Sequence, residues 1–141
     1  MQKIIPFLWF DGRAEEATKF YVSVFKNSRA LSPTTFELDG QTFMAFNGGP
    51  HFTFTPAISL FVNCETQQEV DELWEKLSEG GEKGRCGWLK DKFGISWQTI
   101  PSVLGKLMHD KNPEKSNRVR QAMLQMGKIE IEGLKKAYDQ S

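Results

Sequence analysis

The sequence repeats one pattern of residues at an offset of 53 positions, and this repeat constrains the fold more than any other feature. When the chain is compared with itself at this offset, apolar residues fall on apolar ones and a glutamate falls on a glutamate. The matched positions are Phe7 with Leu60, Trp9 with Val62, Glu16 with Glu69, Ala17 with Val70, and Phe20-Tyr21 with Leu73-Trp74. Self-similarity at a fixed offset indicates a duplicated supersecondary unit. The sequence therefore predicts two copies of one plan.

The first copy is expected to contain a strand, a helix and a hairpin. Residues 3–10 are β-branched and aromatic, with apolar side chains at both parities, which is typical of a strand covered on two sides. Residues 13–25 carry apolar side chains at helical spacing, with Glu15 and Glu16 near the end where the helix dipole stabilises negative charge. The pair Asp39-Gly40 between two apolar runs predicts a two-residue hairpin turn.

The second copy follows the same order. Residues 58–63 predict another strand that is apolar on both faces. A helix is expected next, because Thr66 is followed three residues later by Glu69, as in a capping box, and the glycines at 80–81 end the pattern. Two short extended runs then flank a turn at residues 91–92. We therefore expect an α+β fold.

The rest of the chain is expected to be helical. One helix is predicted over residues 102–109, and further helical segments from Ser116 onward, after a break at Asn112-Pro113. Methionine-rich stripes at helical spacing are usually core or partner contacts, so this tail is expected to pack on the sheet or on another subunit. At 141 residues the chain fits one domain with a real core. Its parts are a first module over residues 1–50, a second over 57–101 and a helical extension over 102–141.

Charge and hydropathy limit the partners and the location. Lys plus Arg number 18 and Asp plus Glu also number 18, so no broad positive field attracts nucleic acid or an anionic membrane. No apolar run approaches the ~20 residues that cross a bilayer, and the N-terminus lacks the signal-peptide pattern. We expect a cytoplasmic protein. Cys64 and Cys86 match no disulfide framework and are expected to be free thiols, with Cys86 either activated by the adjacent Arg85 or packed as a small apolar residue.

Several motifs resemble those of one known family. The chain resembles the PhnB-like branch of the vicinal oxygen chelate superfamily, often labelled demethylubiquinone methyltransferase-like, at PFLWFDG, FELDGQTFMAFNGGPHF, AISLFV and CGWLKDKFGISWQTIP. The resemblance covers nearly the whole chain. It implies two βαβββ modules that form a cup-shaped mixed sheet around a central cavity, as in glyoxalase, bleomycin resistance and dioxygenase proteins, commonly as a homodimer. Between Ser28 and Phe36 the chain is shorter than the family pattern, so a loop is either trimmed or left out there.

The same resemblance implies where a metal would bind. Enzymes of the superfamily usually place a His, Glu or Gln ligand on the first and the last strand of each module. The matching positions here are Pro6, Ala45, Ser59 and Gln98. Proline and alanine cannot ligate, and serine is a poor ligand, so we expect no metal and no other cofactor. A glycine-rich strand-loop-helix for S-adenosylmethionine is also lacking in the sequence.

The resulting hypothesis is a protein that binds a small molecule in a central cavity without metal. Gln98 either hydrogen-bonds that ligand or only satisfies a neighbouring strand or water. Two alternatives stay open. The first is an enzyme, either a metal-dependent lyase, isomerase or dioxygenase, or an acid-base catalyst that uses His51. The second is a dimeric interaction module. His109 is expected to bond the last carbonyls of its helix. The candidate cavity residues are Gln98, Ser59, Asn47, Ser96, Leu8, Phe43, Phe61 and His51.

Overall fold

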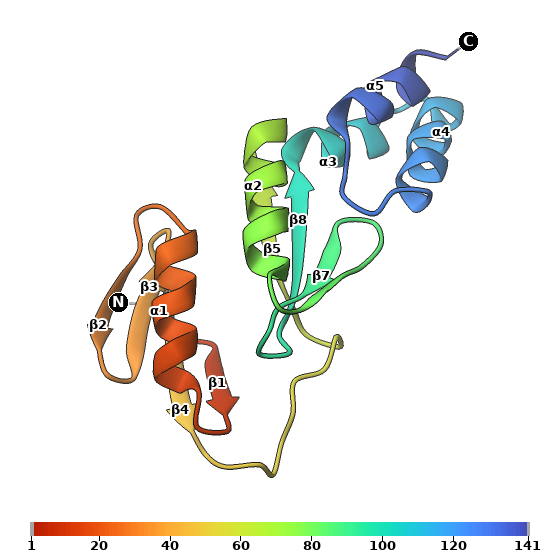
Figure 1. Ribbon diagram of the computed structural model, residues 1–141. Coiled ribbons are helices and arrows are strands. Elements are labelled where there is room, and N and C mark those ends of the chain that lie inside the picture. Colours follow the sequence, from red (N-terminus) through yellow and green to blue (C-terminus); the bar gives the residue numbers. More distant parts are fainter. Residues whose placement is uncertain (1, 141) are drawn as a thin grey trace. The chain divides into compact units, whose positions relative to one another are not determined.

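The computed structural model describes residues 2–140 and contains five helices and eight strands over that range (Figure 1). The chain divides into two compact units, Met1–Phe54 and Thr55–Ser141. Each unit contains one four-stranded mixed sheet, and the order of elements in each is βαβββ. The predicted α+β fold with two such modules is therefore confirmed. Among the described residues, no helix combines the length and the apolar character that a membrane span requires.

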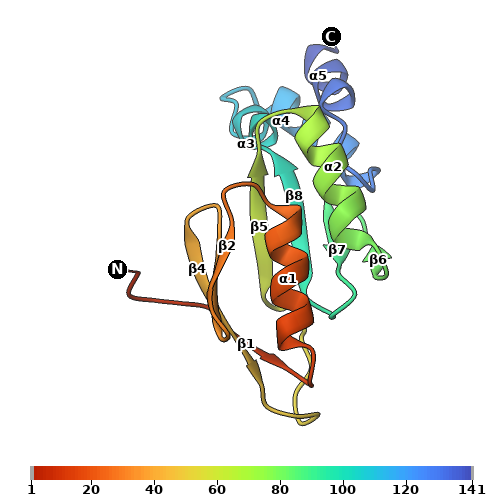
Figure 2. The same cartoon turned by 60° about the vertical axis from the view of Figure 1, so that its left-hand side comes forward.

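The first unit is one βαβββ module. Its elements are β1 (Phe7–Phe10), α1 (Ala14–Val24), β2 (Arg29–Ser32), β3 (Thr35–Leu38) and β4 (Gln41–Asn47). The strands lie in the order β1-β4-β3-β2, and β1 runs parallel to β4. Helix α1 packs on β3 and β4 (Figure 1), and Figure 2 shows the same helix from a second side. The turn between β3 and β4 is the predicted one, since Asp39 and Gly40 have φ angles of 47° and 83°, as a tight hairpin turn with two left-handed residues requires.

Strand β1 begins at Phe7, four residues later than the sequence pattern predicts. Proline has no N–H to donate to the ladder, and Pro6 contributes only its carbonyl, which accepts from the Met44 N–H at 2.9 Å. Ile4 is 85% exposed and Phe7 is 55% exposed. The expectation that this strand is covered on both sides is therefore wrong within the described chain.

The short connection after α1 is an ordered hairpin. Strand β2 pairs with β3 through a turn at residues 33–34, with an irregularity between Ala30 and Ser32. An ion pair of 3.1 Å between Arg29 and Glu37 spans the two strands. The region between Ser28 and Phe36 thus forms two strands joined directly, with no long loop.

The second unit repeats the module. Its elements are β5 (Ser59–Cys64), α2 (Gln67–Ser78), β6 (Glu82–Lys83), β7 (Trp88–Lys90) and β8 (Ser96–Pro101), in the sheet order β5-β8-β7-β6. Adding 53 to the residue numbers of the parallel β1–β4 ladder reproduces the β5–β8 ladder, since Phe7 pairs with Met44 and Leu60 pairs with Trp97. The repeat predicted from sequence is therefore confirmed at the level of strand register.

Helix α2 has the predicted start and end. The Thr66 side chain accepts from the Glu69 N–H at 3.1 Å, and the Glu69 carboxylate accepts from the Glu65 N–H at 2.7 Å. Both bonds satisfy backbone donors that have no partner within the helix. The helix ends at Ser78, and Gly80 follows with a φ of 77°. Helix α2 packs on β7 and β8.

Three further helices complete the second unit: α3 (Ser102–Met108), α4 (Pro113–Leu124) and α5 (Ile131–Asp139). Helix α4 begins three residues before the predicted Ser116, because Asn112 is an N-cap whose side chain accepts from the N–H groups of residues 114 and 115. Proline suits the first helical position, so Asn112-Pro113 opens this helix.

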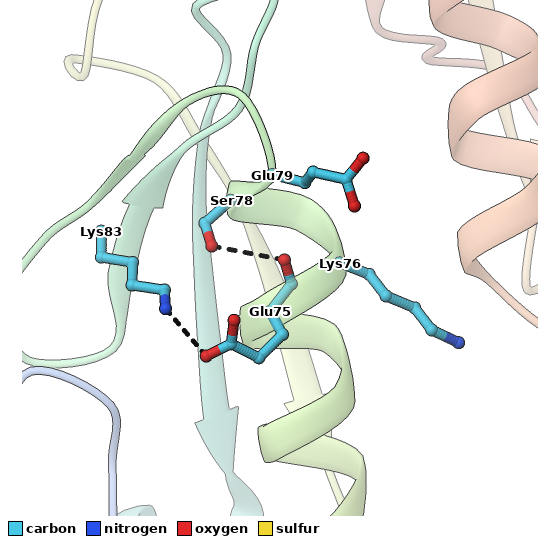
Figure 3. Close-up of a pocket in the computed structure, with 5 residues that line it drawn as sticks. All are labelled: Glu75, Lys76, Ser78, Glu79 and Lys83. Atoms are coloured by element: carbon cyan, nitrogen blue, oxygen red, sulfur yellow. Dashed lines mark hydrogen bonds and ion pairs between the residues drawn. The ribbon is translucent and has the colours of Figure 1, made fainter.

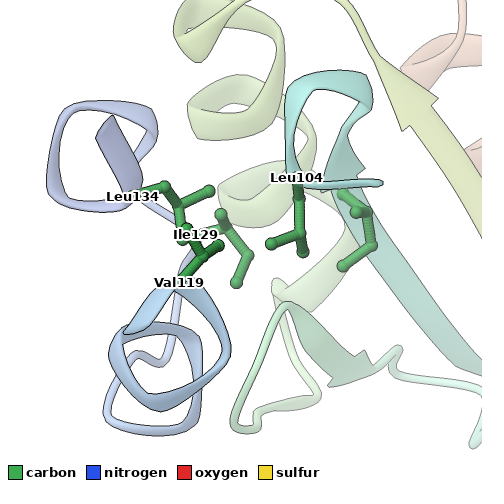
Figure 4. Close-up of a cluster of buried hydrophobic side chains, with 5 residues drawn as sticks. Leu104, Val119, Ile129 and Leu134 are labelled. Carbon is green, nitrogen blue, oxygen red and sulfur yellow. The ribbon is translucent and has the colours of Figure 1, made fainter. Parts of the chain in front are cut away.

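The extension packs on the end of strand β8 in its own unit. Its core is a cluster of five buried side chains, four of which point toward one another in Figure 4. The cluster consists of Ile100, Leu104, Val119, Ile129 and Leu134. Met123 and Met126 pack against it, as a core role for methionine predicts. Of the two predicted partners for this tail, the chain's own sheet is the one observed.

Hydrogen bonds also hold the extension in place. The Gln67 side chain at the start of α2 donates to the Ile129 carbonyl at 2.9 Å and accepts from the Ile131 N–H at 2.7 Å. The N–H groups of Cys86 and Gly87 donate to the carbonyls of residues 126 and 127, both at 2.8 Å. The segment before α5 is therefore bound through its backbone to two separate parts of the module.

Candidate functional site

The middle of the β5–β8 ladder carries a polar pair. Gln98 pairs with Phe61 in the parallel register, and Ser59 lies two residues before Phe61, so the three side chains share one face of the sheet. The Gln98 Nε2 atom donates to the Ser59 Oγ atom at 2.9 Å, and both side chains are half-buried. Phe61 beside them is 53% exposed. This part of the face is polar at its centre and open to solvent at one side.

Trp88 completes a row of three side chains across the sheet. Antiparallel pairing places Trp88 opposite Gln98, and directly opposed residues project from the same face. We call Phe61, Gln98 and Trp88 the Gln98 row. Trp88 is half-buried. Sequence reasoning did not select it, although the signal was present, because Trp88 opens the strand that pairs with the strand of Gln98.

A second row on the same face lies beside the first. Across strands β5, β8, β7 and β6 it contains Ser59, Ser96, Lys90 and Glu82. Ser96 is 3% exposed, so its hydroxyl is largely closed to a ligand. Lys90 and Glu82 lie opposite each other at the margin, with one charge of each sign. The Gln98 row itself contains no ionisable group.

The four positions that the resemblance assigns to metal ligands do not fit a metal here. Pro6 and Ala45 have no ligating side-chain atom, and Ala45 is 1% exposed. Ser59 and Gln98 are neutral and already bonded to each other. A catalytic zinc site uses about three His, Cys or carboxylate ligands. Within residues 2–140, no cluster of three or more His, Cys, Asp or Glu side chains is placed to hold a metal ion.

Two candidates of the first unit contact other elements of that unit. The Asn47 Oδ1 atom accepts from the Ala14 N–H at 2.9 Å, at the start of α1. This bond serves as a tertiary cap, because the N-cap residue Arg13 makes no capping bond through its side chain. Phe43 stacks on Phe36 with ring centroids 5.3 Å apart, and that ring in turn stacks on a tyrosine of α1.

The remaining first-unit candidates are less constrained. Leu8 pairs with Ala45 and is half-buried, while His51 is exposed in the segment that follows β4. The second unit brings together Ser59, Ser96, Phe61 and Gln98 on one strand face, whereas Asn47, Leu8, Phe43 and His51 belong to the first unit. The ligand contacts of all eight stay predictions.

The two cysteines differ in environment. Cys64 is fully buried, and burial raises the pKa of its thiol to about 12, with the nearby Glu69 carboxylate adding to the shift. Its thiol is therefore protonated at neutral pH and is a poor nucleophile. Cys86 is half-buried and has a positive φ of 57°. Both are free, as predicted.

The histidine at the end of α3 has the predicted structural contact. The His109 Nδ1 atom lies 2.7 Å from the Gly105 carbonyl oxygen. The same carbonyl oxygen accepts from the His109 backbone N–H at 3.0 Å, so this histidine caps the last turn of α3.

A hollow of about 320 Å³ lies at the end of α2, beside β6 (Figure 3). Its lining residues are Glu75, Lys76, Ser78, Glu79 and Lys83. The Lys83 ammonium group pairs with the Glu75 carboxylate at 2.8 Å, and the Ser78 hydroxyl donates to the Trp74 carbonyl at 2.7 Å. A lining without apolar or aromatic side chains is unlike that of typical organic ligand sites. The Gln98 row is therefore the better candidate.

Comparison with family models gives one match. The model described as 3-demethylubiquinone-9 3-methyltransferase matches residues 2–35 and 30–100. The two matched stretches overlap at residues 30–35, which include most of β2 and the turn into β3. The match ends before α3, so the helical extension lies beyond it. No curated protein matches the chain.

Solved structures include similar proteins. A putative 3-demethylubiquinone-9 3-methyltransferase, a PhnB protein from Bacillus cereus, is 40% identical with a TM-score of 0.68, and the match covers 72% of this chain and 100% of that one. A protein from Pseudomonas aeruginosa is 21% identical with a TM-score of 0.61, covering 72% and 98%. A glyoxalase-related enzyme from Fulvimarina pelagi is 14% identical with a TM-score of 0.52, covering 73% and 91%. The last two show similarity of fold alone.

Proposed function

Because the chain belongs to the 3-demethylubiquinone-9 3-methyltransferase family of PhnB-like proteins, with the glyoxalase/bleomycin resistance fold, we propose that it binds a small organic molecule at the Gln98 row without a divalent metal. The observation that carries this proposal is the 2.9 Å hydrogen bond between Gln98 and Ser59 on a half-buried face beside an exposed aromatic ring. A few polar groups among apolar and aromatic side chains are typical of small-molecule sites.

Methyl transfer is not part of the proposed function. S-adenosylmethionine enzymes typically hold their cofactor at a glycine-rich loop between a strand and a helix of a doubly wound parallel sheet. In the described residues each sheet has a single parallel pair. The glycine pair at 48–49 follows a strand and the pair at 80–81 follows a helix, and neither pair leads directly from a strand into a helix. The methyltransferase description is therefore kept as a family name only.

The proposed partner besides the ligand is a second copy of the chain. This is supported by exposed aromatic rings in the first unit: Phe46 lies 5.7 Å from Phe7 and 5.4 Å from Trp9, and Phe52 lies 5.0 Å from Trp9, measured between ring centroids. We call these four residues the aromatic face. Monomeric proteins rarely leave such a patch in water. A cytoplasmic location is proposed as well, supported by two cysteines that are both free thiols.

Native mass spectrometry of freshly purified protein tests the function. We expect one organic molecule per chain that is released on denaturation, and no stoichiometric divalent metal. Gln98→Ala and Ser59→Ala each remove one partner of the polar pair, and each is expected to lower the retained fraction about threefold to tenfold.

Gln68→Ala is the matched control, because Gln68 is exposed on α2 and its side chain donates to Glu72 in the same helix. It is expected to retain the molecule as the unchanged protein does. A divalent metal at one per chain, bound through side chains, would contradict the proposal.

A further inference from the structure

The Gln98 row has the spacing of an aromatic clamp. Phe61 and Trp88 lie on strands that flank β8 on either side, and neighbouring strands are about 4.8 Å apart, so their backbones are separated by roughly 9.6 Å. A flat ring stacked on both sides needs the two flanking rings about 7 Å apart. Rotation about χ1 lets both rings lean toward Gln98, which lies between them on β8.

We infer that this row binds a flat, uncharged aromatic ring, inserted between Phe61 and Trp88, with an oxygen acceptor directed at Ser59 and Gln98. This rests on the proposed function and names the chemical class of its ligand. The structure assigns Trp88 to the site, a residue that sequence reasoning passed over.

The polarity of the polar pair favours an acceptor on the ligand. The Gln98 Nε2 atom carries two protons, and one of them is donated to Ser59 Oγ. Among the described residues, the second amide proton of Gln98 and the hydroxyl proton of Ser59 have no protein acceptor, so the pair presents two donors. A carbonyl oxygen, with two lone pairs, accepts both.

The charge around the row favours a neutral ring. Phe61, Gln98 and Trp88 are uncharged, and at the margin Lys90 lies opposite Glu82, so the local charge sums to zero. An anionic or cationic ligand would lose hydration on this half-buried face without gaining a counter-ion. An uncharged ring has no such cost.

Three probes of similar size separate these features. We propose isothermal titration of the full chain with 2-acetylnaphthalene, which is flat and neutral with one carbonyl; 2-decalone, which keeps the carbonyl but is saturated; and 2-naphthoate, which is flat but anionic. The first is expected to bind at least tenfold more tightly than either of the others. Equal or weaker binding of 2-acetylnaphthalene, or no binding of it, would overturn the inference.

Variants assign the binding to the clamp. Phe61→Leu and Trp88→Leu keep an apolar side chain but remove one stacking ring each, and each is expected to weaken 2-acetylnaphthalene about threefold to tenfold. Trp88→Phe restores a ring and most of the affinity, which shows that the loss in Trp88→Leu is not due to misfolding. Leu124→Ala is the control, because Leu124 is 44% exposed but lies on α4, outside both the Gln98 row and the aromatic face.

The outcomes for this inference and for the proposed function differ. If Gln98→Ala abolishes binding while Phe61→Leu and Trp88→Leu bind as before, the clamp is wrong and metal-free binding at Gln98 stands. If all these variants bind like the unchanged protein, the probe binds elsewhere and the clamp is wrong. A stoichiometric metal in the native spectrum contradicts the function itself.

Discussion

The indole N–H of Trp97 donates a 2.8 Å hydrogen bond to the carboxylate of Asp91, which is only 2% exposed. The other oxygen of the same carboxylate accepts from the backbone N–H groups of Phe93 and Ile95, at 2.9 and 3.0 Å. One buried carboxylate thus organises the turn between β7 and β8 and ties it to the strand that carries Gln98.

Replacing this carboxylate should destabilise the second unit. Asp91→Asn puts an amide NH₂ where one acceptor oxygen now lies, so a buried donor loses its acceptor, at a cost of about 1–3 kcal/mol in the free energy of unfolding. Urea denaturation followed by tryptophan fluorescence measures it. Asp11→Asn, at an exposed position, is the control, and equal midpoints for the two variants would contradict the role of Asp91.

The stability that helix α5 contributes should depend on pH through one hydrogen bond. The Tyr138 hydroxyl donates to the Asp110 carboxylate at 2.6 Å, and this bond, together with the Asn112 N–H, lowers the pKa of Asp110 below that of an ordinary aspartate. A carboxyl whose pKa is lowered by folding stabilises the fold above its unfolded pKa, and this contribution disappears as the pH falls through the folded value.

Tyr138→Phe should therefore have a lower Tm than the unchanged protein at pH 7. The difference should shrink steadily from pH 4 downward, as thermal melts at a series of pH values will record. Lys135→Ala is the control, because Lys135 is exposed on the same helix. The change in Tm that it causes should be the same at every pH in this range. A pH-independent difference for Tyr138→Phe would rule out the coupling.

Cys64 should resist alkylation in the folded protein. Its side chain is fully buried, and a thiol with a pKa of about 12 has almost no thiolate at pH 8. In Cys86→Ser, where Cys64 is the remaining cysteine, iodoacetamide should add no mass until urea unfolds the chain. Rapid labelling without urea, detected by intact-mass spectrometry, would show that this part of the sheet opens readily.

Gly48 should tolerate no side chain. A Cβ atom on Gly48 would overlap the Trp9 ring, whose Nε1 atom donates to the Gly49 carbonyl at 2.9 Å. Gly48→Ala should displace this ring and cost about 1–3 kcal/mol in stability. Gly105→Ala has open space around it and lies within α3, so it should instead stabilise by about 0.5–1 kcal/mol. Chemical denaturation of both variants is the measurement, and the same sign for both would refute the packing argument.

Oligomeric state should respond to the aromatic face. Phe46 is 41% exposed and touches the rings of Phe7 and Trp9, so Phe46→Ser removes apolar surface from its centre. Light scattering coupled to size-exclusion chromatography should give the mass of two chains for the unchanged protein and a shift toward one chain for Phe46→Ser. Phe61→Ser, on the second unit, should leave the mass unchanged.

Features set by neighbouring residues were predictable. The Asp39-Gly40 turn and the Thr66 cap depend on local backbone requirements, and both occur where the sequence places them. The offset of 53 residues reflects duplicated register, so it appears again in the parallel ladders. The start of β1 was placed too early because the apolar pattern continues through Pro6, whereas the ladder requires a donor that proline lacks.

Features set by distant residues were not predictable. Trp88 lies beside Gln98 because of the register in which β7 pairs with β8. The Asp91 side chain organises the turn that connects these two strands. Asn47 was selected as a polar cavity group, but its oxygen caps α1 from 33 residues away. No periodicity in either segment encodes such a contact, because it depends on where the other element packs.

The attachment of the last helices has a consequence during biosynthesis. All strands of the first unit are present once residue 47 has emerged from the ribosome, so its sheet is able to close early. The second unit cannot cover Ile100 until Ile129 and Leu134 have been synthesised. The Gln67 side chain likewise has its backbone partners more than 60 residues downstream. A ribosome that pauses after β8 would thus hold a nascent chain with an exposed apolar strand end, a substrate for chaperones.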